Sequence, residues 1–486
     1  MLKSFSTSAA ILLALSLAGC SAKRPQERQP PLPTVTVRTA TMDVTPGLKL
    51  LARIELPDGF TPSPFYPPMW LQSGKEVGVA GTVKGRSIIA GYGGPAWRNE
   101  RVIAEDGGPG AKNGHIVDAS PSPDGMAIAL AVVNPVEKRL DVVVRDLISA
   151  GGGHPVSSFD GEFDEASVGW VDEFTVALAL RAHEGEAPSA AADGEAPTTA
   201  KPAASSGLYL IAINGMVTAE FIKLKCKLSR LSWSPQGDFA VGAGDENSPA
   251  VLIDRRKGSC EQFNARAPIR VLDWSRDDKS FLYEETNRNG DTAAYRYDLA
   301  SRSGRLVAVS SGAAAFIASG DVLALGNRGL SFQRIRARPE RPTLAQLALI
   351  DSKDAEVDVQ SLGFNATAEM LAQSTMSYSR ASNSAAIATF GITRAGPLRR
   401  VLTYSATDKN AFLIAFGPPR GPVLMNWSPR GQYLAMVDGD AVESALTILS
   451  PPRYRPGFHI RPGTGLNTRN DPKGAEDGSK DPTGKG

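Results

Sequence analysis

Few residues of this chain have the types and spacing that catalytic or metal chemistry requires. The nucleophile phrase G-x-S-x-G, the zinc phrase H-E-x-x-H, the C-x-x-C pair and the phosphate-binding P-loop are all absent. No two histidines have the spacing of metal ligands. The four histidines are His115, His154, His183 and His459. We expect them on the surface or in loops, and we predict no catalytic residue, no metal and no cofactor.

An acidic stretch is the main candidate for a cation site. Calcium prefers several carboxylate oxygens close together. The carboxylates are those of Asp160, Glu162, Asp164 and Glu165. The stretch lacks the regular D-x-D-x-D-G spacing of calcium loops, and so does the shorter Asp438–Asp440. Solvated loop charges are therefore the favoured interpretation of both.

The first residues have the organisation of an export signal. Lys3 precedes the apolar run Ala9–Gly19, which is too short to span a bilayer but long enough for the core of a signal peptide. The run ends in Leu-Ala-Gly-Cys, which resembles the lipobox of bacterial lipoproteins. This resemblance implies that residues 1–19 are removed and that Cys20 is acylated. The alternative is an ordinary export signal followed by an incidental cysteine.

An acylated Cys20 implies a tethered protein. Each buried acyl methylene contributes about 0.8 kcal/mol, so two or three chains anchor stably. By the same resemblance, Ser21 favours the outer membrane, with the protein facing the periplasm. Residues 20–46 would form the lipidated cysteine and a proline-rich, extended linker.

The overall charge argues against a nucleic-acid partner. Lysine and arginine number 53 and aspartate and glutamate 51, for a net charge of +2. A dedicated nucleic-acid binder is expected to have a strong basic excess.

A repeated phrase organises the rest of the chain. LSWSPQGDFAVGA begins at Leu231 and LMNWSPRGQYLAMV begins at Leu424. Related phrases recur at intervals of about 41 to 51 residues in most gaps, which is typical of four-stranded propeller blades. Tryptophan anchors five copies: Trp70, Trp170, Trp233, Trp274 and Trp427. The other three anchors are Pro121, Phe316 and Phe364.

Turn chemistry explains the phrase W-S-P-x-G. The serine hydroxyl can bond nearby backbone, proline fixes φ, and glycine accepts a positive φ. The phrase therefore predicts a tight connection between an innermost strand and the next strand. We expect the bulky anchor to pack between adjacent blades. Apolar runs and turn signals follow the anchors, including an Asn-Gly hairpin at Asn289 and Gly290.

The phrases at Trp233, Trp427 and Ser122–Gly125 resemble the TolB-type, WD-repeat-like β-propeller family. The resemblance covers residues 47–456 and implies an all-β propeller of about eight four-stranded antiparallel blades. Seven blades follow if Phe316 or Phe364 is a false copy. The chain lacks the separate N-terminal domain of the TolB family.

The two ends of the repeat region are expected to complete each other. The last unit lacks a fourth strand, and an orphan strand, Gly47–Leu56, precedes the first anchor. Pairing the two would close the propeller and remove an open sheet edge. An insertion near residues 183–206 and the tail at 457–486 have few apolar side chains, so we expect them to be disordered.

Cys226 and Cys260 are the remaining cysteines. Export would place them in a compartment that permits disulfides. The strand order, however, puts Cys226 before the innermost strand and Cys260 in the outermost strand of one blade. That arrangement separates them beyond the roughly 7 Å limit between Cα atoms of a disulfide. Whether they form a bond stays open at this stage.

The sequence predicts a lipid-anchored envelope protein that acts as a non-catalytic, protein-binding scaffold, because propellers present recognition loops on a rigid frame. The TolB resemblance implies an envelope protein as partner. One alternative is a propeller enzyme, such as a lactonase, a lyase or a quinone-dependent dehydrogenase, with a site in the central channel. Another is a scaffold resembling the propeller lipoprotein of outer-membrane barrel assembly, which would bind exposed strands by edge pairing.

Overall fold

The structure is a computed structural model. It describes residues 43–44 and 49–450, except for 109, 113, 149–152, 184–204, 214–218, 223–230, 243–248, 264, 266–268, 287–291, 310–311, 328–341, 354–355, 395, 419–422 and 441. All described residues belong to one compact unit, Ala40–Gly486. The expected signal peptide, Cys20, the tail at 457–486, and nearly all of the linker and the 183–206 insertion lie outside the described residues.

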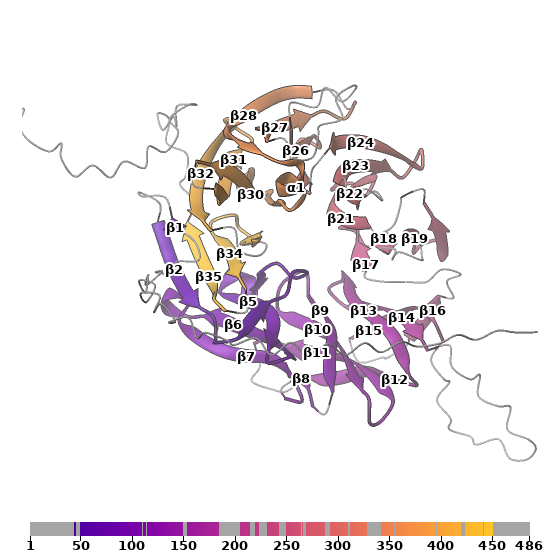
Figure 1. Cartoon of the computed structure of the whole chain (residues 1–486). Coiled ribbons are helices and arrows are strands. Elements are labelled where there is room, and N and C mark those ends of the chain that lie inside the picture. The colour runs from indigo at the N-terminus through magenta and orange to yellow at the C-terminus, as the bar shows by residue number, and fades with distance from the viewer. Residues whose placement is uncertain are drawn as a thin grey trace, which may run out of the picture. The chain divides into compact units, whose positions relative to one another are not determined.

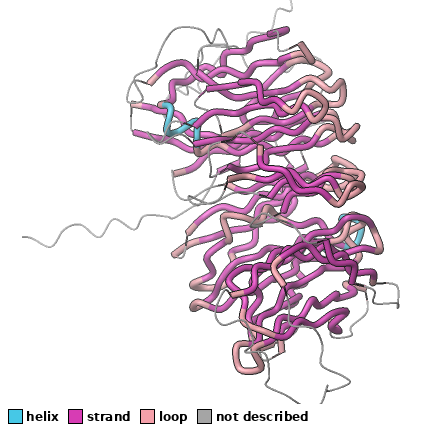
Figure 2. Tube along the Cα trace, turned by 90° about the vertical axis from the view of Figure 1, so that its right-hand side faces the viewer, coloured by secondary structure: helices cyan, strands magenta, loops and turns pink. Residues whose placement is uncertain are grey.

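Most of the described chain is antiparallel sheet (Figure 2). Seven sheets follow one another in chain order, and we number them 1 to 7. Sheet 1 contains β3 (Phe60–Pro62), β4 (Met69–Leu71), β5 (Glu76–Val83), β6 (Arg86–Gly93), β7 (Asn99–Asp106) and β8 (Gly110–Ala111). Two short 3-10 segments, η1 (Gln72–Gly74) and η2 (Pro95–Trp97), connect its strands.

Five sheets have four strands each. Sheet 2 contains β9 (His115–Pro121), β10 (Ala127–Asn134), β11 (Arg139–Asp146) and β12 (His154–Asp160). Sheet 3 contains β13 (Phe163–Asp172), β14 (Thr175–Ala182), β15 (Gly207–Ala212) and β16 (Ala219–Ile222). Sheet 4 contains β17 (Leu231–Trp233), β18 (Phe239–Gly242), β19 (Val251–Asp254) and β20 (Ser259–Gln262). Sheet 5 contains β21 (Ile269–Trp274), β22 (Ser280–Thr286), β23 (Thr292–Asp298) and β24 (Ser303–Val309). Sheet 7 contains β33 (Leu424–Trp427), β34 (Leu434–Gly439), β35 (Ser444–Ser450) and β2 (Lys49–Glu55).

Sheet 6 has nine strands. Its members are β25 (Ala314–Phe316), β26 (Val322–Asn327), β27 (Thr343–Ile350), β28 (Glu356–Ala366), β29 (Thr375–Ser379), β30 (Ser384–Thr393), β31 (Gly396–Ser405), β32 (Asn410–Gly417) and β1 (Asp43–Val44). Between β28 and β29 lies α1 (Ala368–Ala372), whose N-cap Thr367 accepts the Met370 N–H. Among the described residues, no helix is long and apolar enough to cross a bilayer.

The sequence expectation of eight, or seven, four-stranded blades is wrong. Six sheets stand as single blades, and sheet 6 joins two successive four-strand units, β25–β28 and β29–β32. A single residue pair, Asn365 with Ile392, links the units, because the long strand β28 reaches β30 at its end. Sheet 1 gains extra strands because β3 and β8 add to its edges.

The N-terminal strand lies where the sequence placed it, in the last sheet. β2 pairs antiparallel with β35, from Lys49 opposite Ser450 to Glu55 opposite Ala445. Residues 43–44, which the sequence assigned to the linker, pair with β32. The described fold is therefore an all-β propeller in which the first and last parts of the chain share a sheet.

Sheets 2 to 5 present their first strands, β9, β13, β17 and β21, toward the centre (Figure 1). These first strands contact one another in series, for example β9 with β13 and β13 with β17. Each sheet is then covered on both faces by its neighbours. Its strands are consequently almost continuous apolar runs, such as AIALAVV in β10, with little polar alternation.

The hydrophobic core is divided among the sheet interfaces. The apolar cluster between sheets 2 and 3 contains Leu140, Val142, Val176 and Leu178. A comparable cluster joins sheet 7 to sheet 1, and it includes Ile448. Fully burying one such aliphatic side chain contributes about 1.5–3 kcal/mol. The frame that carries the candidate sites is therefore stabilised between sheets as well as within them.

The S-P-x-G turns have the predicted chemistry. The serine hydroxyl in each of four turns accepts the backbone N–H five residues later, at 2.9 to 3.2 Å. These serines are Ser122, Ser234, Ser275 and Ser428. The glycines of three turns have positive φ, with 70° at Gly125, 69° at Gly237 and 64° at Gly431. In sheet 5 Asp278 takes this position with φ of 53°.

The tryptophan anchors pack between sheets, as predicted. Four indole Nε1 groups donate a hydrogen bond to the first strand of the preceding unit. The pairs are Trp70 with the Asn426 carbonyl (3.0 Å), Trp170 with the Ser120 carbonyl (2.8 Å), Trp274 with the Ser232 hydroxyl (3.1 Å) and Trp427 with the Ser377 carbonyl (2.9 Å). Trp233 instead packs against Gly169, where an added Cβ would lie 2.8 Å from the indole Cδ1.

One anchor was assigned wrongly. Phe364 lies in β28, the last strand of its unit, and α1 follows it. The first strand of the next unit is β29, and its anchor is Tyr378, since Trp427 bonds to the residue before it. Tyr378 is followed by Ser379, whose hydroxyl accepts the N–H of Ser382, three residues later. Phe316 ends β25, as the sequence predicted.

These contacts define two faces. Because four of the tryptophan anchors bond at the level of the preceding anchor, these first strands lie side by side and the turns that follow them share one face, which we call the turn face. The opposite side, where the first strands begin, is the entry face. The turn at Phe174 lies on the turn face, and the connection at Val136 lies on the entry face.

Candidate ligand-binding cavities

Five of the first strands line a central cavity of about 710 Å³. Its wall comes from β17, β21, β25, β29 and β33 and from a segment that precedes β4. The side chains include Ile269, Leu272, Met376 and Met425. A cavity of this size is within the usual range for small ligands or for side chains of a bound peptide.

The segment that precedes β4, Ser63–Pro68, runs beside this cavity, and we call it the strap. It is tied down at three points. The Ser63 N–H donates to the Ala80 carbonyl at 3.0 Å, the Tyr66 hydroxyl donates to Asp118, and the Asn426 amide donates to the Pro68 carbonyl at 3.0 Å. Three prolines restrict its backbone further. The strap holds Phe65 at the cavity, 64% exposed.

Asp118 anchors the strap by accepting the Tyr66 hydroxyl. Its carboxylate also accepts the Ala119 N–H at 2.9 Å and, from β13, the Ser167 hydroxyl at 2.7 Å and the Val168 N–H at 2.9 Å. The strap is therefore coupled to the interface between sheets 2 and 3. Nothing in the local sequence around Tyr66 signals this contact, because its partner is 52 residues away.

The most perturbed group of the cavity wall is Asp273. Its oxygens accept the Trp274 and Phe316 N–H groups, each at 2.8 Å. Loss of water around this half-buried carboxyl group raises its pKa to about 6, although both hydrogen bonds and the nearby Arg380 oppose the shift. Tyr378 stands on the same wall, and burial raises the pKa of its hydroxyl.

The charges of the cavity wall are few. Arg270 is engaged, because its Nε donates to Glu284 at 3.0 Å and its Nη2 donates to the Gly312 carbonyl at 2.8 Å. Among the described residues that line the cavity, Asp273 supplies the one carboxyl group and histidine is not represented. This wall can supply apolar contact and a few hydrogen bonds, and it lacks the convergent carboxylates that the enzyme alternative predicts.

The histidines lie where the sequence placed them, as far as they are described. His115 begins β9, His154 begins β12, and His183 follows β14; all three are exposed. His183 pairs with Asp164 at 2.7 Å, and that hydrogen bond raises the pKa of the imidazole. His459 lies outside the described residues.

Carboxylates of the acidic stretch form ion pairs with basic side chains. Glu162 pairs with Lys138 at 2.7 Å, and Glu165 pairs with Arg181 at 3.1 Å. Asp438, the other acidic candidate, is buried against Arg399. Across the described ranges, no group of three His, Cys, Asp or Glu side chains is placed to hold a metal ion.

Cys260, in β20, is in a disulfide bond, and its partner lies outside the described residues. The sequence left open whether Cys226 bonds to Cys260, and Cys226 lies outside the described residues. The acylation of Cys20 likewise concerns a residue that is not described.

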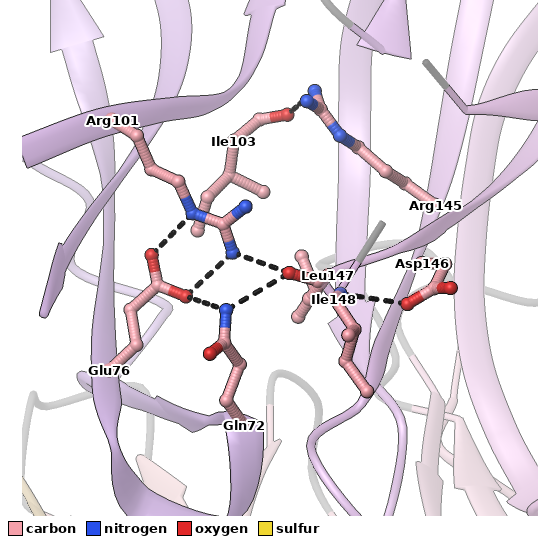
Figure 3. A network of polar contacts seen from close by, with 8 residues as sticks. All are labelled: Gln72, Glu76, Arg101, Ile103, Arg145, Asp146, Leu147 and Ile148. Carbon is pink, nitrogen blue, oxygen red and sulfur yellow. Dashed lines mark hydrogen bonds and ion pairs between the residues drawn. The ribbon is translucent and has the colours of Figure 1, made fainter. Parts of the chain in front are cut away.

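A second cavity, of about 580 Å³, lies on the turn face of sheet 1. Its floor is the polar network of Figure 3, in which Arg101 donates to both carboxylate oxygens of Glu76 at 2.6 and 2.7 Å. Arg101 and Gln72 both donate to the Leu147 carbonyl, at 2.9 and 3.0 Å. Sheets 1 and 2 are thereby joined beneath the cavity.

No protein-family model and no curated protein matches the sequence. Among solved structures, the chain is similar to the β-propeller domain of Cps50 (Swd1) from Myceliophteria thermophila, with 12% identity, 85% of this chain and 100% of that chain covered, and a TM-score of 0.41. It is also similar to the Dos1 propeller, with 11% identity, coverage of 82% and 95%, and a TM-score of 0.45. For Porphyromonas gingivalis dipeptidyl peptidase 4 the identity is 12%, the coverage 78% and 57%, and the TM-score 0.46.

Proposed function

We propose that this chain is a lipid-anchored protein of the bacterial cell envelope that binds another envelope protein at its entry face and catalyses no reaction. The observation that carries the proposal is the strap, which holds Phe65 64% exposed beside the central cavity. Exposed aromatic groups on a rigid support are typical of protein interfaces. The three ties of the strap keep the ordering cost of binding low.

The proposed location in the cell envelope comes from the sequence. The apolar run Ala9–Gly19 and the Leu-Ala-Gly-Cys ending support acylation of Cys20, and Ser21 supports the outer membrane with the propeller in the periplasm. The W-S-P-x-G turns support a TolB-type relationship and hence an envelope protein as partner. The near balance of charge supports the absence of nucleic acid among the partners.

Site-specific crosslinking tests the binding role. A photoreactive amino acid would replace Phe65 in the full chain, expressed in intact envelopes, and adducts would be identified by mass spectrometry. The matched control places the same group at Phe174, which is 59% exposed on the turn face. We expect a reproducible protein adduct from position 65 that position 174 does not give. Identical adduct patterns at the two positions, or none at position 65, would refute binding at the entry face.

Membrane fractionation tests the anchor separately. We expect Cys20→Ala to release the protein from the membrane fraction, because the acyl chains supply the binding energy. If the variant fractionates with membranes as the wild type does, the protein is not held by this lipid.

A propeller enzyme with a site in the central channel is the second candidate. The observation that favours it is Asp273, because a carboxyl group with a pKa of about 6 is suited to general acid–base catalysis near neutral pH. A lactonase, lyase or quinoprotein-like activity lost in Asp273→Asn would support this candidate. An Asp273→Asn variant that keeps the position-65 adduct unchanged would support the scaffold.

A further inference from the structure

The turn-face cavity of sheet 1 has the features of a built site that the scaffold function does not use. Two connections border it, Gln72–Lys75 between β4 and β5 and Gly93–Asn99 between β6 and β7. It lies on the face opposite to the strap. Its ligand can therefore be argued independently of any partner at the entry face.

Both connections hold unusual backbone. Among the described residues, ten that are not glycine have positive φ, and four of them lie here. These four are Gln72 (49°), Ser73 (56°), Ala96 (57°) and Trp97 (59°). Left-handed backbone outside glycine costs free energy and persists where the surroundings impose it, often at ligand sites. Four such residues lie in the two connections that border one cavity, which points to a backbone shape kept for ligand binding.

The floor of the cavity is rigid and electrically balanced. Glu76 is only 4% exposed, and its charge is matched by the two hydrogen bonds from Arg101. Gln72 also donates to Glu76, at 3.1 Å. Gly91 leaves room for this pair, because a Cβ there would lie 2.2 Å from the Glu76 Oε1. Figure 3 shows how the Leu147 carbonyl completes the network from sheet 2.

An aromatic ring and polar side chains of both signs stand on the rim. Trp97 is half-buried, and edge contacts with Trp70 (5.5 Å between centroids, 81°) and Tyr433 (6.2 Å, 76°) fix its ring. Exposed Lys75, Asn99 and Glu100 line the same cavity. They offer an ammonium donor, an amide that donates and accepts, and a carboxylate that already accepts the Tyr92 hydroxyl at 3.2 Å and has further acceptor capacity.

This combination selects the chemical class of the ligand. An anion would meet the Glu100 carboxylate, and a cation would meet the Lys75 ammonium group. A wholly apolar ligand would leave the polar rim without hydrogen bonds, which costs affinity. A sugar has hydroxyl groups that donate and accept, and a C–H face that can pack on an indole ring. We propose that this cavity binds a neutral saccharide, with Trp97 as the platform and Asn99 and Glu100 bonding to its hydroxyls.

The test uses the full chain in detergent and a panel of neutral probes: glucose, galactose, N-acetylglucosamine and diacetylchitobiose. Binding is followed by saturation-transfer NMR and by tryptophan fluorescence. We expect at least one probe to bind saturably. Asn99→Ala and Glu100→Gln, both exposed positions, should each weaken that binding about tenfold. Trp97→Phe should keep binding but remove most of the fluorescence change.

Two controls separate this site from others. Phe65→Ala changes the entry face and should leave sugar affinity unchanged. Glucuronate, which adds a carboxylate to the glucose ring, should bind more weakly than glucose because of Glu100. No saturable binding by any neutral probe would overturn the proposal. Equal binding by the wild type, Asn99→Ala and Glu100→Gln would overturn it as well, since the sugar would then occupy another place.

Discussion

Arg399 in β31 and Asp438 in β34 form a buried ion pair between sheets 6 and 7, with 3.4 Å between Nη1 and Oδ2 and each side chain 1% exposed. Removing one partner of such a pair leaves a charge in a dry interface. We expect Asp438→Ala to lower the free energy of unfolding by about 3–5 kcal/mol. Denaturant unfolding, monitored by tryptophan fluorescence, measures this loss.

A double replacement provides the control for that prediction. Arg399→Met combined with Asp438→Leu should be much closer to wild type than Asp438→Ala, because an apolar pair leaves no buried charge. The exposed pair Lys138 and Glu162 is the matched surface case, and Glu162→Gln should cause no measurable change. A double variant as unstable as Asp438→Ala would contradict the charge-burial account.

Asp273 should make stability depend on pH. Its pKa rises to about 6 in the folded protein, so the folded state holds the proton more tightly than the unfolded chain. The resulting stabilisation is complete below pH about 4 and is lost as the pH rises through about 6. Because the carboxyl group borders a cavity that water can enter, we expect a contribution of roughly 1–2 kcal/mol. Asp273→Asn should remove this part of the pH dependence.

The measurement for Asp273 is the difference in unfolding free energy between wild type and variant at several pH values. The asparagine side chain of the variant has one fewer acceptor for these two backbone N–H groups at every pH. This loss adds a constant difference to the free energy of unfolding. The difference between the two proteins should therefore shrink from pH 4 to pH 7. A difference that stays constant across this range would show that Asp273 titrates normally.

The contribution of an indole hydrogen bond to stability can be measured by comparing a tryptophan that makes this bond with one that does not. Trp427→Phe loses the bond to Ser377, so we expect it to cost about 1 kcal/mol more than Trp233→Phe. In the described part of the chain, the buried Nε1 of Trp233 has no hydrogen-bond partner. Trp427→Ala should cost about 3–5 kcal/mol, since it also opens the sheet interface. Equal losses in the two phenylalanine variants would contradict a role for these bonds.

The disulfide at Cys260 should contribute to stability under oxidising conditions. We expect Cys260→Ser to lower the free energy of unfolding by about 2–4 kcal/mol. Cys226→Ser should give the same loss, and the double variant should lose no more than either single one. Reductant should destabilise the wild type alone. If Cys226→Ser is as stable as wild type, Cys226 is not the partner, and peptide mapping without reduction would identify the one that is.

The sequence predicts the frame of this molecule well because the frame depends on local chemistry. The serine, proline and glycine of each turn act within five residues, so the turns at Ser122, Ser234 and Ser428 could be recognised directly. The tryptophans identified the first strands because they too are a local sequence signal. Tyr378 escaped recognition because its turn lacks both the tryptophan and the proline–glycine pair.

The candidate sites could not be predicted, because their parts come from distant segments. The strap depends on a bond between Tyr66 and Asp118, and the saccharide cavity depends on Leu147 reaching Arg101 from another sheet. The joining of two units in sheet 6 rests on one residue pair between Asn365 and Ile392. None of these contacts produces a periodic pattern in the sequence, because each depends on how neighbouring sheets pack.

The pairing of β2 with β35 has a mechanical consequence. Lys49 lies opposite Ser450, so the chain enters and leaves this ladder at the same end. A force that pulled these two points apart would break the ladder like a zipper, one bond after another toward Glu55 and Ala445, instead of loading every bond together. Tension between Lys49 and a load after Ser450 would therefore peel β2 from β35 at low force.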